Sequence, residues 1–184
     1  MKPDVRSCLD PPWGPFLDDL NQRIAQPIEL HCFGGFVLRV LYERPIETYD
    51  VDYVAVVPHQ ESATLEKIAG RGSELAKKHR VCLQFVTVAE VPENYELRLA
   101  EMCPGRFSKI RLLALDPHDI ALSKLTRNYP IDRRDIAFLA GKGILKPDIL
   151  EERYRLELRP NLANEERHDL TLKLWLEDYF GRVA

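Results

Sequence analysis

The sequence has no long hydrophobic run, and this absence argues against a membrane-spanning helix. None of its 184 residues belongs to an apolar segment of the ~18 residues that a transmembrane helix requires. The first residues, Met1-Lys2-Pro3-Asp4, lead into no apolar stretch of the kind found in secretory signals. We therefore expect a cytoplasmic location and no membrane partner.

The sequence also lacks an excess of positive charge. Its 26 lysines and arginines are outnumbered by 29 aspartates and glutamates, which gives a formal net charge of -3 and a pI near 6.0. Proteins that coat duplex nucleic acid carry a broad basic surface, and this composition does not provide one. A local basic pocket remains compatible with it.

A third absence is any metal-binding cysteine motif. The four cysteines (Cys8, Cys32, Cys82 and Cys103) form no Cys-x-x-Cys pair and have no histidines at matching spacing, which argues against a zinc site. Cys32 and Cys82 lie within apolar runs typical of strands. We expect both to be small buried hydrophobic residues.

The pattern of apolar residues predicts an α+β fold. Alternation predicts strands at residues 28–33, 51–57, 81–88 and 107–115, and helical spacing predicts helices at 13–25, 36–42, 61–78, 147–158 and 165–180. Two further helices are expected, one with Asp116 as its N-cap and one that follows Asp132 and Asp135 and ends at Gly141 or Gly143. We expect a small mixed sheet in residues 1–116 and a helical part in residues 117–184, packed as a single compact unit.

The motif with most chemical content joins a glycine pair to two aspartates. Gly34 and Gly35 end one predicted strand and open a helix, where glycine lets backbone amides approach an anion. Asp50 and Asp52 begin the next strand, and because side chains alternate along a strand both should project from one face. Two hard oxygen ligands so placed can hold Mg²⁺.

This order resembles the signature of the polymerase-β-like nucleotidyltransferase superfamily, in which Gly-Gly or Gly-Ser, a helix and Asp-x-Asp or Asp-x-Glu follow one another. Fourteen residues separate Gly35 from Asp50, a spacing that resembles the AbiEii-like branch. In that branch an arginine and a threonine or serine often precede the first aspartate, and Arg44 and Thr48 stand in comparable places.

A second block is similar to the downstream helix pair of the same branch, which carries a lysine and an Arg-Asp element. It comprises residues 116–125, which include Lys124, and residues 132–136. Residues 151–155 and 158–160 also look like the C-terminal helices of uncharacterised members. The likeness extends over roughly residues 28 to 160.

The resemblance implies transfer of a nucleoside monophosphate from an NTP to an acceptor, which would be a nucleic acid, a protein or a small molecule. It assigns Asp50 and Asp52 as catalytic ligands of Mg²⁺ or Mn²⁺, and Gly34, Gly35, Thr48 and Lys124 as nucleotide or phosphate ligands. It also suggests a toxin-antitoxin role, with a cognate antitoxin or a second copy of the chain as partner.

One position departs from the catalytic pattern. Active members usually place a third carboxylate on a later strand, but residues 81–88 hold no acid, and Gln84 is the polar residue in mid-strand, with Glu90 just beyond. An amide cannot act as a base. A catalytically weakened nucleotide-binding or protein-binding relative is therefore an alternative.

Each candidate site residue also has a simpler, non-catalytic interpretation. Asp50 and Asp52 would also suit a solvated strand face, and the glycine pair would suit a tight turn. Lys124 would suit an exposed helix position, and Asp116, Asp119, Asp132 and Asp135 would suit helix caps. A third hypothesis, an interaction protein with a dimer surface on its C-terminal helices, follows if these interpretations hold throughout.

Overall fold

The computed structural model of the chain describes residues 9–182, which divide into two compact units. The first unit contains residues 9–87 and 99–115, and the second contains residues 88–98 and 116–182. The segment 88–98, which the sequence places before the boundary at residue 116, therefore clusters with the helical unit. Each unit is described separately below.

Five strands of the described chain form one mixed sheet in the first unit. They are β1 (Ile28–Cys32), β2 (Asp50–Val57), β3 (Cys82–Phe85), β4 (Ala100–Met102) and β5 (Ile110–Ala114), in the order β3-β2-β1-β5-β4. β1 runs antiparallel to β2 and parallel to β5, β2 runs parallel to β3, and β4 runs antiparallel to β5. The α+β prediction is confirmed.

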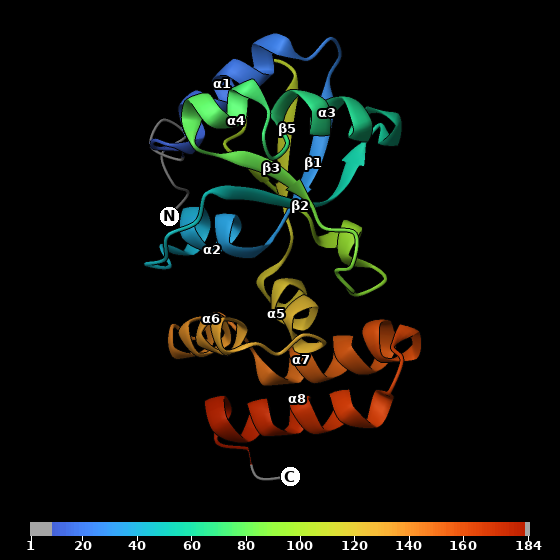
Figure 1. The fold of residues 1–184 in the computed structure, drawn as a ribbon. Helices are drawn as coiled ribbons and strands as arrows, with labels where there is room; N and C mark the ends of the chain where they lie inside the picture. Colours follow the sequence, from blue (N-terminus) through green and yellow to red (C-terminus); the bar gives the residue numbers. More distant parts are fainter. Residues whose placement is uncertain (1–8, 183–184) are drawn as a thin grey trace. The chain divides into compact units, whose positions relative to one another are not determined.

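Four helices cover this sheet. α1 (Trp13–Arg23), α3 (Ser62–Ala69) and α4 (Glu74–His79) pack against one another and lie on one side, while α2 (Gly34–Tyr42) lies on the other (Figure 1). The core side chains, all buried, are Phe16, Leu17 and Leu20 of α1, Leu30, Val51, Tyr53, Leu83 and Leu112 of the strands, Leu65 of α3 and Leu75 of α4. This apolar layer fixes the position of β2, on which the predicted metal ligands lie.

The alternation predicted for β2 is present. Val51 and Tyr53 are fully buried, whereas Asp50 and Asp52 are only partly buried. Tyr53 stacks on Phe85 of β3 with ring centroids 5.2 Å apart, so the two strands share an apolar face. The opposite face carries both aspartates.

The predicted helix over residues 61–78 is wrong, because the chain forms two helices there. α3 ends at Ala69 and α4 begins at Glu74, with Gly70, Arg71, Gly72 and Ser73 as a turn between them. The Ser73 amide donates to the Gly70 carbonyl at 3.1 Å, and the Ser73 hydroxyl accepts from the Ala76 amide at 3.0 Å. Two glycines and a strong N-cap residue favour this break over a continuous helix.

Two other predictions need correction. β4 lies outside the four predicted strands, and residues 147–158 do not form the single α-helix that helical spacing predicts. The chain instead forms α7 (Pro147–Arg153) followed by a π-helical turn, η3 (Tyr154–Leu158). The predicted helix at 165–180 is confirmed as α8 (Glu165–Phe180), and it ends at Gly181 with a left-handed φ of 66°.

The second unit is built around a buried helix. α5 (Pro117–Leu125) is buried from His118 to Leu125 and contacts α6 (Pro130–Gly141), α7 and α8. Asp116 is its N-cap as predicted, and its carboxylate accepts from the His118 amide at 2.9 Å. α6 ends at Gly141 as predicted but begins two residues before Asp132, which accepts from the Tyr129 amide at 3.0 Å.

No helix within residues 9–182 is long and apolar enough to cross a membrane. The segment 88–98 contains a short 3-10 helix, η2 (Tyr95–Arg98).

Candidate functional site

Gly34 packs directly on the carboxylate of Asp52. A Cβ built on Gly34 would stand 2.6 Å from the Asp52 Oδ2 atom, and the residue has a left-handed φ of 69°. The chain is held at this point because the Phe33 amide donates to the Asp52 carbonyl at 3.1 Å. Any residue other than glycine would be strained here and would push the carboxylate away.

The glycine pair begins α2, and it also contacts Thr48. Phe33, the N-cap residue of α2, provides no side-chain cap for the first-turn amides. A Cβ on Gly35 would lie 3.4 Å from the Thr48 hydroxyl oxygen, which makes this a close but ordinary contact. The structure therefore brings Gly34, Gly35, Thr48 and Asp52 together, and the partial positive charge of a helix N-terminus favours the nearby carboxylate.

Asp50 and Asp52 share one face with two residues of β3. In the parallel register Asp50 lies opposite Cys82, and Asp52 lies opposite Gln84. The Cys82 thiol donates to Asp50 Oδ1 at 3.0 Å, which shows that the side chains of this pair meet. The side chain of Asp50 is 34% exposed, so it is open to a ligand from solvent.

Arg71 is a site residue that the sequence alone did not indicate. From the turn between α3 and α4, its Nη2 atom reaches Gln84 Oε1 at 3.4 Å and Asp50 Oδ2 at 3.9 Å. The signal in the sequence is the pair of glycines around it, Gly70 and Gly72, which interrupt the helix predicted over residues 61–78. Only the folded turn places this arginine beside β2 and β3.

The two described free cysteines are buried, as predicted. Cys32 and Cys82 are 0% and 8% exposed. Burial and, after it, the hydrogen bond to the Asp50 carboxylate together raise the pKa of the Cys82 thiol to about 12. Burial, together with the negative charge of Asp52, also raises the pKa of Cys32 well above its ordinary range. Both thiols therefore stay protonated and are poor nucleophiles.

Lys124 lies in the helical unit, on the buried helix α5. Its Nζ atom is 3.0 Å from Asp135 Oδ2 and 3.3 Å from Asp132 Oδ1, and the residue is 7% exposed. The exposed-helix interpretation of Lys124 is therefore wrong. Its assignment as a phosphate ligand stays a prediction, and the ammonium group already has two carboxylate partners.

The site offers two carboxylates for a divalent cation. Oxygen atoms of Asp50 and Asp52 on adjacent same-face positions are donors that Mg²⁺ and Mn²⁺ accept, so the donor chemistry fits. Among residues 9–182, no group of three or more histidine, cysteine, aspartate or glutamate side chains is arranged to hold a metal. This agrees with Gln84, rather than an acid, lying beside Asp52.

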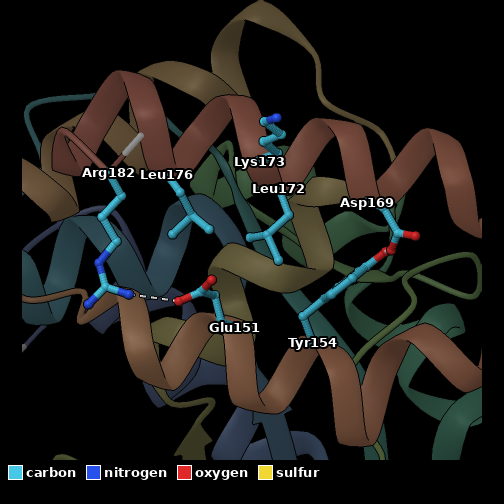
Figure 2. Close-up of a pocket in the computed structure, with 7 residues that line it drawn as sticks. All are labelled: Glu151, Tyr154, Asp169, Leu172, Lys173, Leu176 and Arg182. Atoms are coloured by element: carbon cyan, nitrogen blue, oxygen red, sulfur yellow. Dashed lines mark hydrogen bonds and ion pairs between the residues drawn. The ribbon is translucent and has the colours of Figure 1, made fainter. Parts of the chain in front are cut away.

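A separate pocket of about 460 Å³ lies within the helical unit, between α7 and α8. Leu172 and Leu176 point into it from α8, as Figure 2 shows. Polar and charged groups at its edge already pair with one another: the Tyr154 hydroxyl donates to Asp169 at 2.7 Å, and Arg182 donates to Glu151 at 2.7 Å. The pocket contains none of the predicted site residues.

One family model matches most of the chain. It is described as a nucleotidyltransferase of unknown function (DUF6036), and it covers residues 17–180, which include every predicted site residue. No curated protein and no solved structure matches the chain. The match supports a nucleotidyltransferase family but does not distinguish the AbiEii-like branch. The matched residues include the glycine pair, the two aspartates and the sheet that holds them. Because the match covers most of the chain, the chain belongs to the nucleotidyltransferase family DUF6036.

Proposed function

We propose that this protein is a metal-dependent nucleotidyltransferase that uses an NTP. The observation that carries the proposal is the contact between Gly34 and the Asp52 carboxylate, where a Cβ would stand only 2.6 Å from Oδ2. A glycine needed only for a tight turn would not have to lie against a carboxylate. The N-terminus of α2 lies beside the Asp52 carboxylate, an arrangement that suits a phosphate chain and a cation bound together.

Each predicted site residue of the first unit has a role in this proposal. Asp50 and Asp52 would hold Mg²⁺ or Mn²⁺, while the amides of Gly34 and Gly35 and the hydroxyl of Thr48 would bind phosphate oxygens. A divalent ion bound there supplies charge neutralisation and alignment for an in-line displacement. Val51 and Tyr53 anchor β2 in the core, and this anchoring keeps the Asp50 and Asp52 carboxylates together on the opposite face of the strand.

The transfer step follows from the chemistry of an NTP. An acceptor oxygen forms a bond to the α-phosphorus as the bond from that phosphorus to the bridging oxygen of the β-phosphate breaks. Pyrophosphate leaves with the bonding electrons, and the acceptor proton passes to solvent. No side chain is assigned as base, because Gln84 occupies the position that would carry the third acid.

A second candidate function is nucleotide binding without transfer. The pairing of Asp52 with Gln84 favours it, because an amide adds no charge for a second cation. In this case the two aspartates would bind one metal and its nucleotide, and the protein would act through a partner.

Thermal unfolding with each NTP and Mg²⁺ tests both candidates. A ligand that binds only the folded state raises the melting temperature by mass action, so at least one NTP should raise it in the natural chain. Asp50→Asn and Asp52→Asn should lose this shift. Asp148→Asn, at a side chain that is 81% exposed on α7, is the matched control and should keep it. No shift with any NTP contradicts both candidates.

Transfer is then separated from binding with α-labelled NTPs. We expect label on a nucleic acid, protein or small-molecule acceptor together with pyrophosphate release, both absent in Asp52→Asn. NTP binding with no pyrophosphate from any acceptor would leave the binding function alone.

The proposal includes the toxin-antitoxin role that the resemblance implies, and this role has its own test. Induced expression of the natural chain should arrest bacterial growth, and Asp52→Asn should not. Normal growth under induction would contradict this part of the proposal while leaving the transfer assay unaffected.

A further inference from the structure

Arg71 is presented to the carboxylate face by a turn that is fixed at both ends. A Cβ on Gly70 would collide with the Glu66 carbonyl oxygen, and Gly72 has a left-handed φ of 87°. Ser73 closes the turn through its amide and caps α4 through its hydroxyl. The backbone at Arg71 is therefore held in place, while its side chain is 78% exposed and free to change rotamer.

The contacts of the Arg71 guanidinium are weak ones. Its Nη2 atom is 3.4 Å from the neutral Gln84 Oε1 and 3.9 Å from Asp50 Oδ2, both longer than an ordinary charge-assisted hydrogen bond. A glutamate at position 84 would bind this cation and neutralise it. The amide leaves the positive charge of Arg71 available to an incoming anion.

The anion expected at this face is a chain of phosphates. The proposed phosphate-binding amides of Gly34 and Gly35 adjoin Asp52, and Arg71 adjoins Asp50 and Gln84, so a triphosphate over the carboxylate face would have donors on both sides. Guanidinium groups bind phosphate through two parallel hydrogen bonds, which a lysine at the same place cannot reproduce.

We propose that Arg71, in the turn between α3 and α4, binds the triphosphate of the nucleotide. Its guanidinium supplies positive charge on the side of the site where Gln84 stands in place of an acid. This inference rests on the proposed function, because it requires a triphosphate at Asp50 and Asp52. Arg71 is then a substrate-binding residue, and Gln84 lies beside its guanidinium without neutralising it.

The test uses inorganic tripolyphosphate, which carries the phosphates without a base or sugar. Titration calorimetry with Mg²⁺ present should show binding to the natural chain, and Arg71→Ala should weaken it roughly tenfold, the loss expected for one hydrogen-bonded charge pair. Arg71→Lys should recover part of the affinity. Lys77→Ala removes a positive charge from α4, where the side chain is 64% exposed, and should leave the affinity unchanged.

Binding of Mn²⁺ alone provides a second readout. Removing a cation close to Asp50 should leave Mn²⁺ affinity equal or higher in Arg71→Ala, whereas Asp52→Asn should lower it. A purely structural role for Arg71 would instead weaken Mn²⁺ and tripolyphosphate together, along with thermal stability, and this outcome would overturn the inference.

Failure of the inference is distinguishable from failure of the proposed function. Tripolyphosphate binding that Asp52→Asn abolishes and Arg71→Ala leaves intact overturns the role of Arg71 alone. Absence of tripolyphosphate and NTP binding in the natural chain overturns both.

Discussion

Gly34 is restricted by two separate features of its surroundings. Its φ of 69° is one that residues with a Cβ rarely adopt, and the space where a Cβ would lie is taken by the Asp52 carboxylate. Gly143 has nearly the same backbone angle, φ 67°, but a Cβ there would meet no heavy atom within 4 Å. Alanine substitutions at Gly34 and Gly143 therefore separate the effect of backbone strain from the effect of displacing the Asp52 carboxylate.

We expect Gly34→Ala and Gly143→Ala to destabilise the protein by similar amounts, about 1–2 kcal/mol, because both force alanine into the left-handed region. Only Gly34→Ala should also reduce binding of Mg²⁺ with tripolyphosphate, since its Cβ moves Asp52. Chemical denaturation measures the first effect and titration calorimetry the second. Unchanged ligand binding in Gly34→Ala would show that the glycine is a turn residue alone.

Gln84 is the second position where one residue decides the chemistry. It lies opposite Asp52, so Gln84→Glu would place a third carboxylate on the face that holds the other two. Even beside Arg71, an added charge that is partly exposed should improve Mn²⁺ binding about fivefold. Gln60→Glu, at an exposed position before α3, makes the same chemical change and should leave Mn²⁺ binding as it is. Equal Mn²⁺ affinity in both variants would contradict the prediction that residue 84 shares a face with Asp50 and Asp52.

At the scale of elements, α5 is stabilised at its start by a charged cap. The Asp116 carboxylate accepts from the His118 amide and ring and from Arg153, whose Nη1 atom also donates to the fully buried Asp119 at 3.0 Å. Burial pushes the pKa of Asp116 upward, but these hydrogen bonds outweigh it and lower the pKa from 3.8 to about 2. The charged form of Asp116 is thus favoured by folding.

This pKa predicts a loss of stability in acid. Because the folded pKa lies below the unfolded one, the contribution of Asp116 is complete above about pH 4 and disappears as the pH falls through about 2; it amounts to roughly 2 kcal/mol. Asp116→Asn keeps the capping oxygen without the charge. Its stability should therefore fall less than that of the natural chain over this range.

The comparison is made by urea unfolding at several pH values. Glu152→Gln, at an exposed position on α7, is the control and should follow the natural chain. If the stability of Asp116→Asn fell with pH in parallel with that of the natural chain, the role of Asp116 in acid stability would be contradicted.

At the scale of the whole molecule, the chain passes between its two units more than once. It leaves the first unit after Thr87, returns at Leu99 and leaves again after Leu115. Within the second unit, ion pairs hold the segment 88–98. Arg98 donates to Asp119 Oδ2 at 2.9 Å and to Glu157 Oε2 at 2.7 Å, and its side chain is only 20% exposed.

Arg98→Met should destabilise the helical unit by roughly 3 kcal/mol, because it removes one partner from the buried Asp119 and leaves Glu157 without its guanidinium. Hydrogen exchange should show loss of protection in residues 88–98 before the rest of the unit. Arg155→Met, at an exposed position in η3, is the control and should change little. Protection of residues 88–98 that matches the natural chain would rule out this role for the ion pairs.

The sequence by itself determined the α+β class, the helix at residues 165–180 and the order along the chain of a glycine turn followed by a carboxylate strand. These features depend on local period and on glycine, which act over a few residues. β4 escaped sequence analysis because three residues are too few to show alternation, and its partner, β5, lies several residues further along the chain.

Only the tertiary structure decided what lies beside the two aspartates. The parallel pairing of β2 with β3 sets Gln84 opposite Asp52, and the turn at Gly70 and Gly72 brings Arg71 to Gln84. It likewise buries Lys124 between Asp132 and Asp135, where the sequence left a phosphate ligand and an exposed helix position as the two interpretations. Strand register and helix packing are long-range properties, so local patterns in the sequence do not specify them.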